Sequence, residues 1–478
     1  MRIVLLLFIG PLLWGGCSET RNDSSGVGSF SEQQFVSVDS ICQAFMDRGN
    51  TVGMSIGLSH NGKTVFSKGY GLANITSQKP ATDSTIYAIA SVSKFVTAIA
   101  TMKMIEEGRL ALTDKVVDHL EDFPHQEHMD EITIEHLLRH QSGLVDHEDW
   151  FDSIYINEKR VFTNQELYTF LNRPLFFRPG TNYTYSNSGY AILSSILESI
   201  EQKSFHQIIK EKIGKPLAIH SLGMWPENWQ DEHATMGYEL VNGEVDTSLH
   251  MMTKSMKGDG GLSSSVVDLL QLMDHLAEGS IVSDSVLSVM LTPTPIFNIL
   301  VDYGLGVKFG RYAEQFTFGH SGGYKGTTWA MVMHYPESGF TFAAAMNTNY
   351  SPDEIMDLRH MIMPVVLNAE PPTLDDDARV VHIEKYVGQY SAFNRWGTGN
   401  PPTRVASSKD GKLFWQNPFS DNPARPLFQI NDSIFTWAAY PYDQLRFHHV
   451  DGEVVACSEY YDGMFGMVRI KNDTLQSN

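Results

Sequence analysis

The spacing of apolar residues changes along the chain and predicts where strands and helices lie. Met54–Leu58 and Lys63–Phe66 flank His60-Asn61-Gly62, and an Asn-Gly pair between two extended runs predicts a β-hairpin. From Ser91 to Gly108 the apolar residues recur at steps of three and four, which predicts a largely buried helix. We expect further helices at 134–139, 165–172, 191–202 and 266–277, and strands with two apolar faces at 330–334 and 340–346.

The order of these elements predicts the fold class. Strands come from both ends of residues 33–368 and helices from the middle. This order favours an α/β arrangement, in which the two ends of the domain contribute the edges of one sheet. Prolines and acidic residues at 369–379 predict a linker. Beyond it, short apolar runs separated by turn residues predict a separate all-β, barrel-like domain at 380–478.

Residues 1–17 have the order of an export signal: a basic residue, an apolar run, and then Gly15-Gly16-Cys17. Small residues before a cysteine resemble a bacterial lipoprotein signal, although Trp14 stands where leucine would be usual. We therefore expect Cys17 to become the lipid-bearing first residue, with a polar tether at 18–32 and a membrane-anchored location in the periplasm or cell envelope. The alternative is an ordinary secretory signal cut nearby.

Composition and charge narrow the class of protein. The chain has 478 residues, of which 42% are hydrophobic and 19% charged, as expected for a globular protein with a large core. Its net charge of −21 would repel a phosphate backbone, so we do not expect a nucleic-acid partner. Three cysteines without short paired spacings exclude a disulfide framework and a cysteine-based zinc site.

Ser91-Val92-Ser93-Lys94 is the only S-x-x-K in the sequence and lies where the predicted buried helix begins. A serine at a helix N-terminus lies in the positive end of the helix dipole, and a lysine three residues later shares its face. Such a serine can be activated as a nucleophile. The alternative is a helix-capping serine with an incidental lysine.

The motifs around this tetrapeptide resemble those of the serine β-lactamase and penicillin-binding superfamily, especially its class C branch with the related esterases and D-amino-acid peptidases. Their order and spacing agree over about residues 40–365. The resemblance implies a β-lactamase-like α/β (α+β) fold, in which an antiparallel sheet is flanked by helices and accompanied by a helical subdomain. The C-terminal domain resembles the lipocalin-like domain appended to several such hydrolases, and Tyr386–Tyr390 matches its opening strand. The motifs are Ser91–Lys94, Glu107–Leu110, Leu112–Asp114, Ile132–Leu144, Pro179–Thr181, Tyr185–Tyr190, Gly260–Ser264, Tyr303–Gly306 and Gly319–Gly323.

The resemblance implies roles for the first two motifs. Ser91 attacks a carbonyl carbon and forms an acyl-enzyme. Lys94 and Tyr185 act as the acid/base pair, and Tyr185 then activates the water for deacylation. Asn187 orients Lys94 and the substrate amide. We expect no cofactor and no metal.

The third motif is His320-Ser321-Gly322, where true β-lactamases commonly have Lys-Thr-Gly. By resemblance these residues bind substrate, Gly322 allows close substrate approach, and the backbone N–H groups of Ser91 and Gly323 form the oxyanion hole. Histidine is largely neutral at pH 7, whereas lysine offers a charge for a substrate carboxylate. We therefore favour amide or ester hydrolysis, of the D-peptidase or esterase type, over efficient β-lactam hydrolysis.

Several alternatives remain open. The chain could be a sensor that acylates on penicillin or peptidoglycan fragments without turnover, or a purely structural lipoprotein. The expected partner is a small molecule or short peptide, including peptidoglycan fragments. The C-terminal domain could be a lid on the active-site mouth or a packing module, and we slightly favour the packing module.

Other motif matches lack the required context. Tyr155-Ile156-Asn157 has no preceding Pro-Gly, and Ser420-Asp421-Asn422 lies after the third motif. His136 and His140 are one helical turn apart, but Leu137 follows the first, so the metalloprotease pattern fails. We favour capping and core hydrogen bonds for these histidines.

Overall fold

A computed structural model describes most of the chain. The described residues are 30–49, 51–148, 150, 163–224, 233–241, 244–246, 256–324, 327–348, 352–375, 379–393, 401–461 and 464–472. The export signal, Cys17, most of the tether and Tyr155-Ile156-Asn157 lie outside them. None of the helices in these ranges has the length and apolar character needed to cross a membrane.

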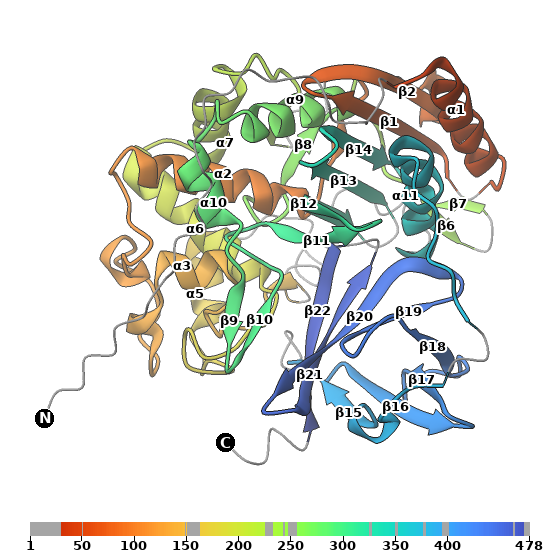
Figure 1. Cartoon of the computed structure of the whole chain (residues 1–478). Coiled ribbons are helices and arrows are strands. Elements are labelled where there is room, and N and C mark those ends of the chain that lie inside the picture. The colour runs from red at the N-terminus through yellow and green to blue at the C-terminus, as the bar shows by residue number, and fades with distance from the viewer. Residues whose placement is uncertain are drawn as a thin grey trace, which may run out of the picture.

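A seven-stranded antiparallel sheet forms the centre of the first domain, in the order β11-β12-β13-β14-β1-β2-β3 (Figure 1). Strands from the two ends of the domain meet in its middle, where Ile56 of β1 pairs with Ala344 of β14. Asn61 and Gly62 both have positive φ, as a type I′ hairpin requires. The strands are β1 (Gly53–His60), β2 (Lys63–Asn74), β3 (Lys79–Pro80), β11 (Lys308–Tyr312), β12 (Gln315–Tyr324), β13 (Thr328–Tyr335) and β14 (Phe340–Met346).

Helices cover both faces of this sheet and build a helical subdomain beside it (Figure 1). On one face α1 (Glu32–Met46) and α11 (Pro352–Leu367) pack together over apolar strand residues. On the other face lie α9 (Val266–Ala277) and the almost completely buried α2 (Val92–Glu106). The remaining helices are α3 (Ile134–Leu138), α5 (Asn164–Leu171), α6 (Asn187–Glu201), α7 (Phe205–Ile209) and α10 (Asp284–Met290).

The first domain confirms the predicted antiparallel sheet with flanking helices. The helices expected at 134–139, 165–172 and 266–277 match the observed ones to within one residue at each end, whereas α6 starts at Asn187 rather than at 191. Helix α6 begins early because the Ser186 hydroxyl accepts the Gly189 N–H and caps it. Short strands complete the domain: β4 (Tyr87–Ala88), β5 (Gly223–Met224), β6 (Glu239–Val241), β7 (Glu244–Asp246), β8 (Leu262–Ser264), β9 (Thr294–Ile296) and β10 (Ile299–Val301).

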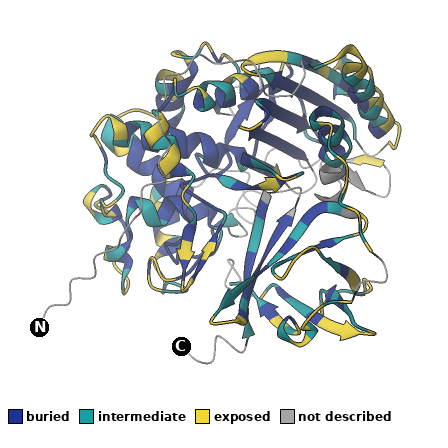
Figure 2. Cartoon of the chain, in the orientation of Figure 1, coloured by how far each residue is buried: buried dark blue, intermediate teal, exposed yellow. Residues whose placement is uncertain are grey.

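A closed eight-stranded antiparallel barrel forms the C-terminal domain, which confirms the predicted all-β unit. Its interior is filled by apolar side chains, among them Leu413, Phe435 and Phe447. Figure 2 shows the buried residues concentrated in the central sheet and helices and the exposed ones on the outer turns. The strands are β15 (Gly388–Ser391), β16 (Thr403–Lys409), β17 (Lys412–Gln416), β18 (Arg425–Gln429), β19 (Ile434–Trp437), β20 (Tyr440–Val450), β21 (Glu453–Tyr461) and β22 (Met464–Lys471).

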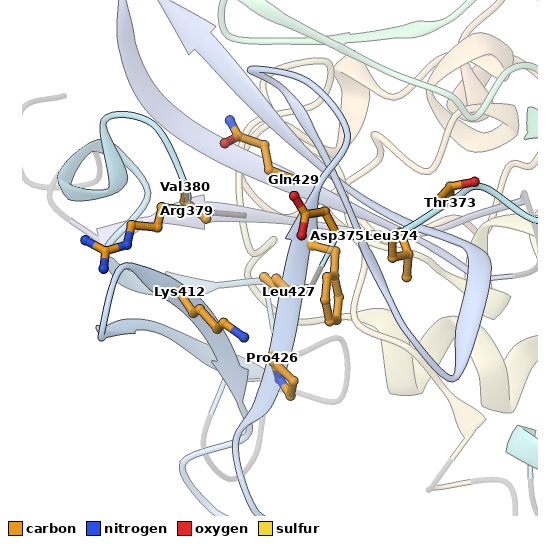
Figure 3. Close-up of a pocket in the computed structure, with 10 residues that line it drawn as sticks. Thr373, Leu374, Asp375, Arg379, Val380, Lys412, Pro426, Leu427 and Gln429 are labelled. Atoms are coloured by element: carbon orange, nitrogen blue, oxygen red, sulfur yellow. The ribbon is translucent and has the colours of Figure 1, made fainter. Parts of the chain in front are cut away.

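The predicted linker lies against the barrel. Residues 373–375 and 379–380 line a pocket of about 120 Å³ together with Lys412 of β17 and residues 426–429 of β18 (Figure 3). The Val380 N–H donates to the Gly411 carbonyl, which attaches the end of the linker to a barrel turn.

The barrel packs on the first domain through polar and apolar contacts. Asp302 accepts hydrogen bonds from Arg446 and from the Tyr460 hydroxyl, both at 2.8 Å. Around these bonds, one buried cluster mixes Tyr183 and Val301 of the first domain with barrel residues including Phe465. These contacts fix the position of the barrel relative to the first domain.

Candidate active site

Ser91 lies at the start of α2, and its side chain does not cap the helix. Lys94 instead donates a hydrogen bond from Nζ to Ser91 Oγ at 3.1 Å. The preceding residue, Ala90, is buried with a φ of 44°, a strained conformation for a residue other than glycine. The helix-capping alternative therefore does not describe Ser91, whose half-buried hydroxyl is held beside an ammonium group.

The ammonium group of Lys94 is completely buried and has three acceptors. Besides Ser91 Oγ, it donates to Asn187 Oδ1 at 2.5 Å and to the backbone carbonyl of Asp259. A lysine ammonium has three N–H donors, so these contacts use all of them. Lys94 is thereby oriented toward Ser91 and has no donor left for substrate.

Asn187 is oriented by carboxylates that the sequence analysis did not single out. Asp146 accepts the Asn187 backbone N–H at 2.8 Å and its Nδ2 at 3.2 Å, and Glu148 accepts Nδ2 at 3.0 Å. The amide oxygen must then face Lys94. In the sequence, both acids follow directly after the motif ending at Leu144, which is the one signal that could have singled them out. Spacing alone could not show that they contact Asn187, about forty positions later.

Tyr185 contributes a half-buried ring to the same site. Lys94 Nζ lies 4.9 Å from the centre of this ring, and the His140 ring packs against it at 4.3 Å between centroids. Tyr185 immediately precedes the Ser186 cap of α6, so the start of that helix places both Tyr185 and Asn187 beside Lys94. The structure thus brings together Ser91, Lys94, Tyr185 and Asn187.

His320 is completely buried and takes part in a hydrogen-bond chain. The Ser186 N–H donates to His140 Nδ1, so the His140 proton lies on Nε2 and faces the Tyr303 hydroxyl at 2.9 Å. That hydroxyl can then donate to His320 Nε2 at 3.4 Å, while His320 Nδ1 donates to the Ser321 carbonyl at 2.6 Å.

Burial, together with the positive charges of Lys308 and Lys94, holds the pKa of His320 well below its usual range. His320 is therefore neutral at pH 7. Because its ring is buried and both ring nitrogens have hydrogen-bond partners, His320 stabilises the conformation of the third motif and is not exposed to substrate.

Gly322 permits a close approach between β12 and α2. A Cβ at this position would lie 2.3 Å from the Ser91 backbone nitrogen. The absence of a side chain at Gly322 therefore lets Ser91 itself lie close to β12. Strand β11 pairs with β12 only as far as Gly319. Within the described strands, residues 320–324 pair with β13 alone, which leaves their other edge for an extended substrate. Ser321 is half-buried and Gly323 exposed along this stretch.

The barrel contributes to the surroundings of Tyr185. Tyr183, Thr184 and Tyr185 line a mainly apolar pocket of about 130 Å³ whose other side is formed by barrel residues. The packing-module interpretation is therefore incomplete, because the barrel also forms a wall next to a candidate catalytic residue. The barrel residues are Ala392, Phe393, Pro402, Gly466, Met467 and Val468.

The remaining motif matches have local structural roles. His136 Nδ1 accepts the Thr133 N–H in a capping box, and His140 belongs to the buried chain described above. The Asn422 N–H donates to the Ser420 hydroxyl in a barrel turn. Within the described ranges, no three His, Cys, Asp or Glu side chains are grouped so that they could hold a metal ion.

The fold and the site together define a protein of the serine β-lactamase and penicillin-binding type. The family model described as Beta-lactamase matches residues 38–362, and the chain belongs to this family. Penicillin-binding protein 4* of Bacillus subtilis (strain 168) is 28% identical over 293 residues, which cover 58% of this chain and 64% of that protein. Protein flp of Staphylococcus aureus (strain NCTC 8325 / PS 47) is 31% identical over 212 residues, or 44% of this chain and 42% of that protein. The chain thus spans less than two thirds of the length of these curated relatives.

Solved structures share the fold at low sequence identity. The octameric penicillin-binding protein homologue from Pyrococcus abyssi matches with a TM-score of 0.62 and 23% identity, over 90% of this chain and 99% of that one. D-amino acid amidase from Ochrobactrum anthropi SV3 matches with a TM-score of 0.63 and 21% identity, over 70% of this chain and 99% of that one. The first match covers so much of the chain that it extends into the barrel.

Proposed function

We propose that this chain hydrolyses an amide or ester bond through an acyl-enzyme on Ser91, with D-amino-acid amides or short peptides as the favoured substrate class. The observation that carries the proposal is the arrangement of Lys94 Nζ, which bonds Ser91 Oγ and Asn187 Oδ1 and lies beside the Tyr185 ring. The class is suggested by the related proteins, which include a D-amino acid amidase and a D-stereospecific amidohydrolase from Streptomyces sp..

In acylation, Ser91 Oγ forms a bond to the carbonyl carbon and transfers its proton to the Tyr185 oxygen of the Lys94–Tyr185 pair, because Lys94 already donates all three of its N–H groups. The carbonyl electrons move to the oxygen, where the N–H groups of Ser91 and Gly323 stabilise the negative charge. The intermediate then expels the amine or alcohol, which takes up the proton.

Deacylation repeats these steps with water as the nucleophile. Tyr185 accepts the water proton, the new bond forms at the acyl carbon, and Ser91 leaves with a proton restored. Because Lys94 is already bonded to Asn187 and Asp259, it holds its position while the proton moves. Asn187 keeps its amide oxygen toward Lys94 throughout because Asp146 and Glu148 hold the amide nitrogen.

The apolar pocket beside Tyr185 supports a substrate with a hydrophobic group next to the reacting carbonyl. Its volume of about 130 Å³ suits a small aliphatic or aromatic side chain. The substrate would then contact both the catalytic domain and the barrel. As part of the same proposal, the signal at 1–17 exports the protein and Cys17 anchors it by a lipid to the bacterial cell envelope, where peptidoglycan fragments are available.

The test compares hydrolysis of p-nitrophenyl butyrate and D-alanine p-nitroanilide by the tether-truncated protein and its Ser91→Ala form. Turnover that depends on Ser91 is expected, and the preferred substrate distinguishes peptidase from esterase activity. A stoichiometric burst without turnover would instead identify an acyl-binding sensor. Equal rates for the two forms, with neither acylated by a labelled penicillin, would contradict the proposal.

A further inference from the structure

Two ionisable side chains lie next to the groups that hold Lys94, and the reaction steps proposed above do not use them. His147 Nε2 and Asp259 Oδ2 are 3.7 Å apart, and both side chains are completely buried. A buried charge is unfavourable unless an opposite charge or hydrogen bonds compensate for it. An imidazole and a carboxyl group that meet in this position therefore depend on each other.

Asp259 belongs to the segment that accepts a hydrogen bond from Lys94. Its backbone carbonyl is one of the three acceptors of the Lys94 ammonium group. The neighbouring Gly258 is attached to two helices, because its N–H donates to the Ser194 hydroxyl of α6 and its carbonyl accepts from the Thr97 hydroxyl of α2. The position of the Asp259 carbonyl thus depends on how this segment is held.

His147 connects that segment to a second acceptor of Lys94. Its Nδ1 lies 3.1 Å from the hydroxyl of Ser188, the residue after Asn187. Asn187 Oδ1 accepts a hydrogen bond from Lys94, as the Asp259 carbonyl does. One imidazole ring therefore joins Asp259 to the neighbour of Asn187.

The hydrogen bonds around His147 indicate where its protons lie. The Ser188 hydroxyl donates its one hydrogen to the Val145 carbonyl at 2.7 Å, so it accepts from His147 Nδ1, which therefore carries a proton. A neutral ring protonated at Nδ1 would turn the lone pair of Nε2 toward Asp259, and two buried acceptors that face each other repel. Asp259 Oδ1 already accepts the Lys257 N–H at 2.9 Å, which leaves Oδ2 to face the ring. Imidazole is a stronger base than a carboxylate, so a proton on Nε2 removes the repulsion and makes an ion pair.

We propose that a doubly protonated His147 and the Asp259 carboxylate form a buried bridge that positions two acceptors of Lys94, so that both are positioning residues for acyl transfer. The proposal rests on the acyl-transfer function proposed above. Neither side chain is exposed to substrate, since both are completely buried. The bridge restricts the movement of Asn187 and of the Asp259 carbonyl. Lys94 therefore keeps one direction toward Ser91 Oγ.

The kinetic experiment compares Asp259→Ala, Asp259→Asn and His147→Ala with the parent protein on p-nitrophenyl butyrate. Both alanine variants should lower kcat about ten- to hundred-fold, because Lys94 is held less firmly, and should change KM by less than about threefold. Asp259→Asn should recover most of the loss, because its amide can donate an N–H to His147 Nε2. His334→Ala, which removes a different buried histidine, is the matched control and should leave kcat unchanged.

Nitrogen NMR with isotope-labelled histidine tests the bridge without any substrate. Both ring nitrogens of His147 should be protonated at pH 7 in the parent protein, and only Nδ1 in Asp259→Asn. A parent ring with a single protonated nitrogen would overturn the bridge even if the alanine variants fail to fold.

The kinetic outcomes are kept separate from the proposed function. If neither esters nor amides are turned over, the rate at which a labelled penicillin acylates Ser91 gives the same comparison between variants. Parental kcat or acylation rates in both alanine variants, or a rise in KM at constant kcat, would overturn the positioning role. A parent protein that shows neither turnover nor acylation would contradict the proposed function, whereas the NMR result would still decide whether the bridge exists.

Discussion

Gly322 of β12 lies directly against Ser91, so that a Cβ on Gly322 would come within 2.3 Å of the Ser91 backbone nitrogen. The same added atom would lie 2.7 Å from the Ile89 carbonyl oxygen. Both neighbours are backbone atoms and cannot rotate away. The distance between Ser91 and β12 thus depends on the absence of a side chain at one position.

Gly322→Ala should therefore displace β12 from α2. We expect kcat to fall by about 100-fold, since small misplacements of reacting groups have effects of that order. The free energy of unfolding should fall by about 1–3 kcal/mol, as for other overpacked sites. Gly189→Ala is the control, because its new Cβ would have no neighbour closer than 3.5 Å. Steady-state kinetics and urea denaturation measure both effects, and a Gly322→Ala enzyme with parental kcat would contradict the close approach.

Asp146 should matter for turnover without contacting substrate. Asp146→Ala removes an acceptor of two Asn187 donors in a buried site, which costs about 1–3 kcal/mol. The Asn187 amide is then oriented less firmly, by Glu148 and Lys94. We expect a lower kcat with little change in KM. Glu121→Ala, at an exposed position, serves as the control. If KM rose while kcat stayed the same, Asp146 would act on substrate binding instead.

The barrel wall predicts a change in acyl preference. Phe393→Ala enlarges the apolar pocket and removes contact area beside Tyr185. A buried methylene contributes about 0.8 kcal/mol. The preference for p-nitrophenyl butyrate over the acetate should therefore decrease several-fold, with the rate on the acetate nearly preserved. An unchanged butyrate-to-acetate ratio would mean that the substrate does not use this pocket.

Acid should destabilise the protein in a defined pH range. Burial lowers the pKa of His334 to about 4 from its ordinary value of 6.5, so the folded state holds the neutral ring. The unfolded chain binds the proton more readily, and the stabilisation present above pH 6.5 is lost as the pH falls toward 4. His334→Gln should flatten this part of the stability curve, whereas exposed His125→Gln should not. Urea denaturation at pH 7, 5.5 and 4.5 measures the slopes, and equal slopes for parent and His334→Gln would refute this assignment.

Lys308 should lower stability at neutral pH. Its folded pKa of about 8 lies below its ordinary value of 10.5. The folded state therefore binds this proton less tightly than the unfolded state does, although Lys308 is protonated in both states at pH 7. Two titratable groups face it: Lys94, whose charge lowers the Lys308 pKa further, and His320, which is neutral. Lys308→Met should therefore raise the free energy of unfolding at pH 7, on the order of 2 kcal/mol. The gain should shrink between pH 8 and 10.5, where the parent loses this proton on folding. A gain that does not vary with pH would point to packing instead.

Local sequence patterns were sufficient to predict those helices, turns and strands whose conformation depends on residues close together in the sequence. The helix beginning at Ser91 follows from apolar spacing, and its first turn alone determines that Lys94 reaches back to Ser91. The turn at Asn61-Gly62 follows from the φ angles those two residues tolerate. The closed barrel was predicted as an all-β unit because short apolar runs and turns repeat through it.

Patterns were less informative where a side chain acts on a distant residue. The third motif predicted a neutral His320, but the sequence did not indicate that this ring is buried behind Tyr303. Nor did it indicate that Asp146 and Glu148 orient Asn187. The barrel was expected mainly to pack, and only its docking through Asp302 places barrel residues beside Tyr185.

The sequence by itself predicted the candidate nucleophile Ser91, its neighbour Lys94, a separate all-β unit and the family to which the chain is similar, because contiguous motifs and periodicities carry this information. Tertiary structure alone decided that Lys308 lies at the active site. Its position depends on how β11 pairs with β12, and the register between strands is set by the whole sheet rather than by the residues next to Lys308.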